Sequence, residues 1–238
     1  MLRSPALDAI GCGGRLAPVA RTRPMSSSST LSMGGNLARS NIVRKLPVLL
    51  FDVMGTIVRD PFYKDVPAFF GLSMKELLEI KHPTAWIEFE KGLITEEQLK
   101  HRFFNDGRDF DLQGLKSCMV AGYEFIEGME ELLCSLKSSG FEMHAFTNYP
   151  DWYMLIEDKL QLSRYLEWTF VSCHTGKRKP EINAYLDVLQ QLQVDSSDCT
   201  FVDDQRRNVE AAKSLGINAI IFESFENLCD KLAHLKSL

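Results

Sequence analysis

Long hydrophobic runs are missing from this chain of 238 residues. A membrane-spanning helix needs about 20 consecutive apolar residues. The best candidate, Val48-Leu49-Leu50-Phe51, has only the length of a strand before the chain reaches Asp52. The sequence therefore predicts no membrane partner.

Cysteine patterns that bind metals are missing as well. The six cysteines form no CxxC pair, and no spacing of Cys and His suits a zinc site. We therefore expect buried or idle thiols in a reducing compartment, rather than disulfide bonds or structural zinc.

Acidic residues are nearly absent from the first 46 positions, which hold six Arg and one Lys against a single acid, Asp8. The same segment contains seven Ser and no compact apolar stretch of the kind that a secretory signal requires. This composition is typical of an organelle transit peptide. We interpret residues 1–45 as a leader for an organelle import machinery; the Ser content favours the chloroplast, with the mitochondrion as the alternative. A disordered tail, or a basic arm for an acidic partner, is the competing interpretation.

The charge reverses after this leader. The remaining residues carry 20 basic and 31 acidic groups, which is a net charge of −11. Binding of nucleic acid requires a basic footprint, so we expect no nucleic-acid partner. The whole chain is 45% apolar and 25% charged, which is ordinary usage for a globular protein with a sizeable core.

Short apolar runs alternate with helical patterns along most of the chain. Strands are predicted at residues 46–53, 141–147, 168–172, 199–203 and 219–222. Helices are predicted at residues 129–136, 150–159, 182–192 and 208–215, with a last helix at the C-terminus. This alternation indicates an α/β fold with a doubly wound, Rossmann-like parallel sheet.

Residues 60–128 interrupt the alternation. They show helical signals, including a capping box from Thr95 to Gln98, and few strand signals. We interpret them as a small helical domain inserted after the first strand. The core domain then comprises residues 46–59 and 129–238.

Polar side chains follow several of the predicted strands: Asp52, Thr147-Asn148 and Asp203-Asp204. A basic loop at residues 177–179 joins them, in which Lys177 and Arg178 are expected to be solvated and Lys179 to be the ligand. The carboxyl ends of parallel strands meet at one edge of a sheet, which is where such folds bind ligands. Carboxylates gathered there need a cation, and Mg²⁺ prefers hard oxygen ligands. Thr, Asn and Lys side chains can bind phosphate oxygens. The pattern therefore predicts a phosphoryl-transfer site for a small-molecule phosphate, with a carboxylate available as nucleophile.

These residues lie in four motifs whose order resembles the haloacid dehalogenase superfamily over residues 46–238: Asp52-Val53-Met54-Gly55-Thr56, Phe146-Thr147-Asn148, Lys179-Pro180 and Phe201-Val202-Asp203-Asp204. The resemblance implies a core with a helical cap and a Mg²⁺-dependent phosphomonoester hydrolase. It also implies that Asp52 forms an aspartyl-phosphate and binds the metal. The other implied metal ligands are the Met54 carbonyl, Asp203 and Asp204, and the implied phosphate ligands are Thr147, Asn148 and Lys179, with Lys179 also balancing the charge of the nucleophile.

Met54 departs from the family pattern, because phosphatases of this superfamily usually have an acid–base Asp two residues after the nucleophile. Acid–base help contributes about 10²–10⁴ in rate, so the departure leaves a slow phosphatase, a substitute proton donor or a non-catalytic phosphate-binding protein as alternatives. A carbon–halogen hydrolase on the same fold uses no metal, and the pair at residues 203–204 argues against it. The candidate substitutes are His82, Glu88, Glu90 and His174.

Within the superfamily, residues 49–58, 60–67 and 81–83 resemble the plastid flavin mononucleotide hydrolases of plants. The resemblance implies that flavin mononucleotide is the substrate and that another small phosphometabolite is the alternative. In such a cap, an aromatic side chain in the cleft would stack on the flavin ring. The candidates for that role are Phe62, Tyr63, Trp86 and Phe89, whereas Phe103, Phe104, Tyr123 and Phe125 are expected to fill the cap's own core.

Overall fold

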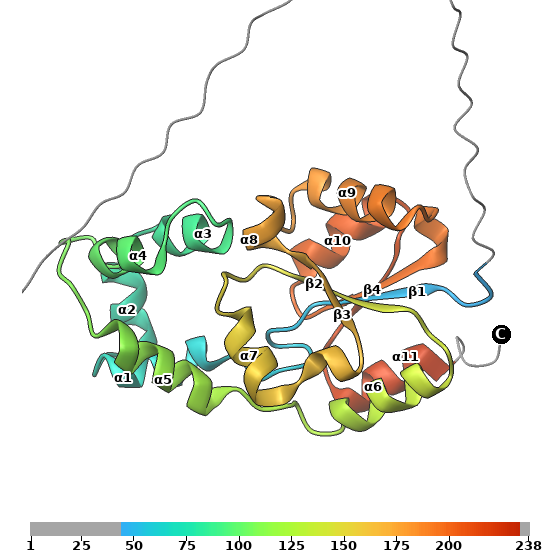
Figure 1. Cartoon of the computed structure of the whole chain (residues 1–238), viewed down its shortest axis with the longest axis horizontal. Helices are drawn as coiled ribbons and strands as arrows, with labels where there is room; N and C mark the ends of the chain where they lie inside the picture. Colours follow the sequence, from blue (N-terminus) through green and yellow to red (C-terminus); the bar gives the residue numbers. More distant parts are fainter. Residues whose placement is uncertain (1–43, 234–238) are drawn as a thin grey trace, which may run out of the picture. The chain divides into compact units, whose positions relative to one another are not determined.

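A computed structural model describes residues 44–233 of the chain (Figure 1). All of the predicted leader except its last two residues lies outside this range. Arg44 already contacts the folded domain, since its guanidinium pairs with Glu142 at 2.8 Å and donates to the Leu192 carbonyl at 3.1 Å. Contacts with the folded core therefore extend at least to Arg44, two residues before the predicted boundary.

The core contains a parallel sheet of five strands in the order β3-β2-β1-β4-β5. The strands are β1 (Val48–Phe51), β2 (Met143–Thr147), β3 (Glu167–Val171), β4 (Cys199–Asp203) and β5 (Asn218–Ile221). The predicted α/β sheet is thereby confirmed. Because every strand runs in the same direction, the residues that follow β1, β2 and β4 meet at one edge of the sheet.

Both faces of the sheet are buried, which explains why the strands are continuously apolar. Leu49 and Phe51 point to one face and pack in a cluster with α6 and α11, while Val48 and Leu50 point to the other face, toward α9 and α10. Figure 1 shows these two helix pairs on opposite sides of the strands.

The helices of the core largely follow the predicted pattern. They are α6 (Met129–Ser138), α7 (Tyr153–Leu160), α8 (Ser172–Thr175), α9 (Ile182–Leu192), α10 (Arg206–Ser214) and α11 (Phe225–Ala233), with short 3₁₀ turns η2 (Leu162–Arg164) and η3 (Ser196–Asp198). In this described part, no helix has both the length and the hydropathy needed to cross a bilayer. The five cysteines that the structure describes are all free thiols.

The segment of residues 60–128, which we call the cap, contains no strand of the sheet and several short helices. They are η1 (Pro61–Tyr63), α1 (Asp65–Phe69), α2 (Met74–Ile80), α3 (Ala85–Glu90), α4 (Glu96–Arg102) and α5 (Leu112–Gly122). The predicted capping box at Thr95 is present, and a second one begins α2 at Ser73. Four phenylalanines fill the centre of this cap, with ring centroids 5.0–6.3 Å apart: Phe70, Phe103, Phe104 and Phe110.

The cap is joined to the core by polar contacts as well as by one shared hydrophobic cluster. Trp152 of the core donates its indole N–H to Glu96 of the cap at 2.8 Å. The hydroxyls of Tyr123, at the end of α5, and Tyr149, after β2, lie 2.7 Å apart. These contacts hold α3, α4 and the end of α5 against the sheet edge that carries the polar residues.

Candidate active site

Lys179 is at the centre of the polar cluster. Its ammonium lies 2.8 Å from Asp52 Oδ1, 2.7 Å from Asp203 Oδ2 and 2.5 Å from the Phe146 carbonyl oxygen, and only 1% of the residue is exposed. These three acceptors match the three N–H donors of an ammonium group. Its position is therefore fixed between the carboxylates that follow β1 and end β4.

Asp203 and Asp204 differ in how many hydrogen bonds their carboxylates already accept from the protein. Asp203 is fully buried and accepts hydrogen bonds from Gln205 N, from the Asn208 amide and from Lys179. Asp204 is partly exposed and accepts one hydrogen bond, at 2.7 Å, from the Gln205 side chain. Asp204 thus has more free acceptor capacity for a ligand than Asp203.

The charges of this cluster do not balance. Ionised Asp52, Asp203 and Asp204 carry three negative charges against the single positive charge of Lys179, and one ligand oxygen from each carboxylate lies within 4.8 Å of the others. Burial raises the pKa of Asp52 to about 7, despite the opposing charge of Lys179. Burial also raises the pKa of Asp204. A divalent cation with oxygen ligands would relieve this imbalance, so the residues present fit Mg²⁺.

The turn after β1 brings Met54 and Gly55 next to Asp204. Gly55 has a φ of +78°, and a Cβ atom there would lie 2.8 Å from Asp204 Oδ2, so only glycine fits. Hydrogen bonds from Ile57 N and Val58 N to the Val53 carbonyl close the turn. Among the described residues no backbone N–H donates to the Met54 carbonyl, which leaves it available as a ligand.

The predicted phosphate ligands behave differently from one another. Thr147 is 2% exposed and its hydroxyl has no hydrogen-bond partner within residues 44–233, which is the state expected of a group waiting for a ligand. The Asn148 side chain instead bonds the backbone of Lys179 twice, at 2.8 and 2.9 Å. Asn148 therefore positions the loop that carries the lysine, and one of its amide hydrogens remains for phosphate.

The basic loop differs from the expectation of a solvated turn. Arg178 donates to Glu90 Oε2 at 2.9 Å and so connects the core to helix α3 of the cap. The Ser172 hydroxyl donates to the Glu90 carbonyl at 2.5 Å. Solvation of Arg178 was the wrong expectation, because its partner lies 88 residues away in sequence. Lys177 pairs with Asp187 on α9 at 2.8 Å.

The candidate substitutes for the missing acid–base Asp are engaged elsewhere in several cases. His82 Nδ1 accepts the Ala85 N–H at 3.2 Å, where it caps α3. Glu88 is bound to Thr84 and Arg102. The structure adds a carboxylate that the sequence did not single out, Asp60, which begins the cap and interacts electrostatically with Asp204.

The candidate aromatic residues of the cap differ in packing and exposure. Trp86 and Phe89 pack edge-on against Trp152 at 6.0 and 5.3 Å, and the Trp86 indole donates to Glu90. Tyr63 is 60% exposed, and burial together with the charges of Asp60 and Asp204 raises the pKa of its hydroxyl. Of the four candidates, Tyr63 is the one whose side chain is exposed, so its ring is available to a ligand.

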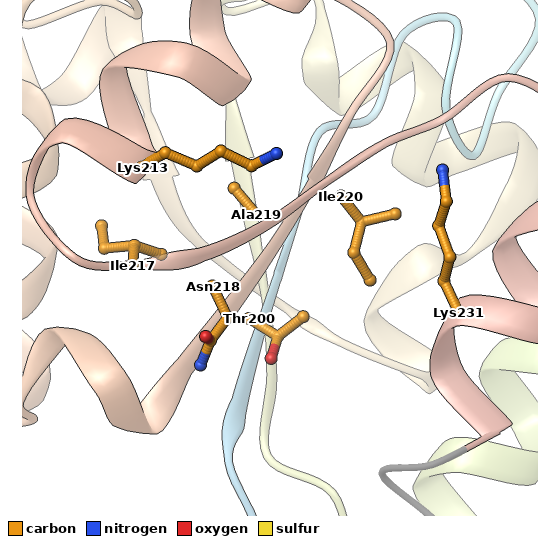
Figure 2. Close-up of a pocket in the computed structure, with 7 residues that line it drawn as sticks. All are labelled: Thr200, Lys213, Ile217, Asn218, Ala219, Ile220 and Lys231. Carbon is orange, nitrogen blue, oxygen red and sulfur yellow. The ribbon is translucent and has the colours of Figure 1, made fainter.

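A separate pocket of about 620 Å³ lies along the outer strand β5 (Figure 2). Its lining includes Thr200, Asn218 and the side chains of Lys213 and Lys231. It contains none of the predicted site residues and no carboxylate, His or Cys. This pocket therefore offers none of the side chains that the expected chemistry requires.

Comparison with known proteins agrees with this geometry. The family model for haloacid dehalogenase-like hydrolases matches residues 61–222. The chain belongs to this family of hydrolases. A protein from Arabidopsis thaliana described as a chloroplast flavin mononucleotide hydrolase is 58% identical over 204 residues, which are 86% of this chain and 82% of that protein.

More distant relatives share the same framework. A phosphoglycolate phosphatase from Pseudomonas savastanoi pv. phaseolicola is 29% identical over 74% of this chain and 69% of its own. A HAD family enzyme from Bacteroides thetaiotaomicron, crystallised with magnesium and inorganic phosphate, superposes with a TM-score of 0.63 at 19% identity, covering 77% of this chain and 98% of that one. This structural likeness confirms the fold.

Proposed function

We propose that the protein hydrolyses flavin mononucleotide to riboflavin and phosphate in a Mg²⁺-dependent reaction with Asp52 as nucleophile. The observation that carries the substrate is the 58% identity to a chloroplast flavin mononucleotide hydrolase. The observation that supports the chemistry is the buried cluster of Asp52, Lys179, Asp203 and Asp204 at the sheet edge.

In this proposal, one specific oxygen of the Asp52 carboxylate attacks phosphorus. Lys179 donates a hydrogen bond to Oδ1. Oδ2 accepts no hydrogen bond from the described residues and is not fully enclosed by the protein. Oδ2 would form the bond to phosphorus while the ester oxygen leaves, and water would then release phosphate from the aspartyl-phosphate. Lys179 keeps Oδ1 oriented and balances charge throughout.

Phosphate would be held by groups that the protein leaves unused. The Thr147 hydroxyl and the remaining amide hydrogen of Asn148 would donate to its oxygens. All three donors of Lys179 are already occupied, so a hydrogen bond from Lys179 to phosphate requires it to release one acceptor. Mg²⁺, held by Asp52, Asp204, the Met54 carbonyl and Asp203, would supply neutralisation of the phosphate charge.

The cap supplies a surface for the flavin. Tyr63 is the exposed aromatic among the four candidates, and Phe62 meets its ring edge-on at 5.6 Å. Stacking of an aromatic ring contributes about 0.5–1.5 kcal/mol beyond the burial of area. Such a ring favours an isoalloxazine group over a hexose.

The deciding experiment measures phosphate release by the purified protein with Mg²⁺ from flavin mononucleotide, hexose phosphates and small glycolytic phosphates. We expect the highest kcat/KM for flavin mononucleotide. Tyr63→Ala should raise KM for flavin mononucleotide about 2–10-fold, from the stacking energy given above, and leave KM for a small phosphate unchanged. A sugar phosphate with the higher kcat/KM would contradict the substrate.

We also propose that the protein works in the chloroplast and reaches it through the N-terminal leader. The Arg-rich, acid-poor composition of residues 1–45 supports import, and the Arabidopsis relative is described as chloroplastic. The mitochondrion is the alternative, and a fluorescent fusion of the full chain distinguishes the two organelles.

A further inference from the structure

Given the phosphatase activity proposed above, on which this inference rests, the chain needs a proton donor that Met54 cannot provide. In phosphoryl transfer the attacking and leaving oxygens lie roughly in line with phosphorus. The leaving oxygen therefore lies on the far side of phosphorus from Asp52, toward the cap. A donor has to stand where the cap begins and close to the sheet edge.

Asp60 stands at that junction. The turn that starts at Val53 returns the chain so that Val58 pairs with Met54 on one side and with Phe125 on the other. Arg59 N then bonds the Glu124 carbonyl at 2.9 Å, and Asp60 is the next residue, the N-cap of η1. Asp60 is thus the first residue of the cap. It directly follows the segment that pairs with both Met54 and Phe125.

The Asp60 carboxylate has one fixed oxygen and one free oxygen. Oδ1 accepts the Phe62 N–H at 2.9 Å. Oδ2 accepts no hydrogen bond from any residue in the range 44–233. The protein does not enclose this oxygen completely, so it reaches solvent. The fixed oxygen orients the group, and the free one can exchange a proton with a ligand.

Charged and phenolic groups of both the cap and the core act on Asp60 through their electrostatic field. Those that interact with it electrostatically are Arg59, Tyr63, Glu90, Tyr123, Tyr149 and Asp204. Asp204 follows β4 and Tyr149 follows β2, whereas Glu90 is on α3 and Tyr123 ends α5. Asp60 therefore lies where the cap meets the catalytic edge. Burial, reinforced by the charge of Asp204, raises the pKa of Asp60 to about 6.

Glu90 is the competing carboxyl group, and its oxygens are already used. Oε1 accepts the Trp86 indole N–H at 2.8 Å, and Oε2 accepts Arg178 at 2.9 Å. Burial raises the pKa of Glu90, but neither of its oxygens is free to face a leaving group. Glu90 therefore acts as a structural link, and Asp60 is the better placed acid.

We propose that Asp60 is the general acid and base that replaces the missing aspartate at position 54. As the Asp52–phosphorus bond forms and the ester P–O bond breaks, the Asp60 proton passes to the leaving alcohol oxygen. The Asp60 carboxylate then takes a proton from the water whose oxygen attacks phosphorus. The Asp52–phosphate bond breaks, phosphate leaves, and both carboxyl groups return to their starting state.

The test compares Asp60→Asn with the wild-type full chain in Mg²⁺ on two substrates, flavin mononucleotide and p-nitrophenyl phosphate. Asn keeps an oxygen for the Phe62 N–H and is a good N-cap, so the fold is retained. We expect kcat for the alkyl phosphate to fall about 10²–10⁴-fold and kcat for the aryl phosphate, whose leaving group needs little protonation, to fall much less. The decrease in wild-type kcat for the alkyl phosphate above pH 6 should disappear in the variant, and Asp60→Glu should recover part of the activity.

Asp65→Asn is the matched control. Asp65 pairs with Arg59, the neighbour of Asp60, and its replacement should leave both rates unchanged. Asp60→Ser, which also caps a helix, is the second variant if Asn destabilises the fold. Equal falls on both substrates, or alkyl turnover within threefold of wild type, would overturn the role of Asp60. Wild-type protein that releases no phosphate from any ester would instead refute the proposed function, and the role of Asp60 with it.

Discussion

Replacing Lys179 with Met tests how far the buried charges of the site depend on one cation. Methionine has a similar length but removes the ion pairs to Asp52 and Asp203 and the hydrogen bond to the Phe146 carbonyl. Removing one partner from a buried ion pair costs about 3–5 kcal/mol, because the remaining charge is left uncompensated. For a domain of this size that corresponds to a fall in Tm of about 6–20 °C.

The loss should depend on pH in a defined direction. Burial holds the pKa of Asp52 in the folded state at about 7, above its ordinary value, so its ionisation destabilises the fold as the pH rises through the window from about 4 to 7. Without Lys179, no positive charge among the described residues of the carboxylate cluster offsets the cost of ionising buried Asp52. The loss in Tm should therefore be largest near pH 8 and shrink toward pH 5, where Asp52 is protonated.

Thermal denaturation followed by circular dichroism, with a chelator present and at several pH values, measures this effect. Lys177→Met is the matched control. Lys177 lies two residues before Lys179 and makes a partly exposed pair with Asp187, so its replacement should change Tm little. A Lys179→Met variant as stable as wild type at pH 8, or one whose loss grows as the pH falls, would refute the reasoning.

Three further outcomes are expected. Asp52→Asn should abolish phosphate release while leaving the circular dichroism spectrum unchanged, because an amide cannot form the aspartyl-phosphate; wild-type turnover would disprove covalent catalysis. Met54→Asp should raise kcat for alkyl phosphates more strongly in the Asp60→Asn background than in wild type, and equal gains in both would show that the two positions act independently; Mg²⁺ affinity is measured alongside. Removal of residues 1–43, which keeps the Arg44–Glu142 pair, should preserve kcat/KM and prevent import of a fluorescent fusion; organelle signal from the truncated fusion would contradict the leader.

The sheet could be predicted from the sequence because its strands are short apolar runs that end at polar residues. Residues 199–203 were predicted as a strand, and β4 has those bounds. The start of α7 was less accurate, since Pro150 was expected to open the helix. Tyr153 N instead bonds the Pro150 carbonyl at 3.0 Å in a tight turn, and the helix begins at Tyr153. The four-residue helix α8 is too short to produce a periodic signal.

Long-range partners could not be predicted in the same way. The bridging role of Arg178 depends on its hydrogen bond to Glu90, and the proposed role of Asp60 depends on its electrostatic interaction with Asp204. Both partners are far away in the sequence. Nothing in a run of basic residues distinguishes a bridging arginine from a solvated one. The only local signal at Asp60 is its place before Pro61, which indicates a helix N-cap and no more.

The contacts between cap and core have a consequence for protein engineering. Cutting the chain at residues 60 and 128 and inserting the specificity domain of another enzyme would remove the partners of three core side chains, namely Glu96 for Trp152, Tyr123 for Tyr149 and Glu90 for Arg178. Arg178 precedes Lys179, which contacts the proposed nucleophile Asp52, so a poorly matched graft would disturb the candidate active site as well as substrate choice. A chimera of this protein has to transplant the cap together with the core residues that receive it.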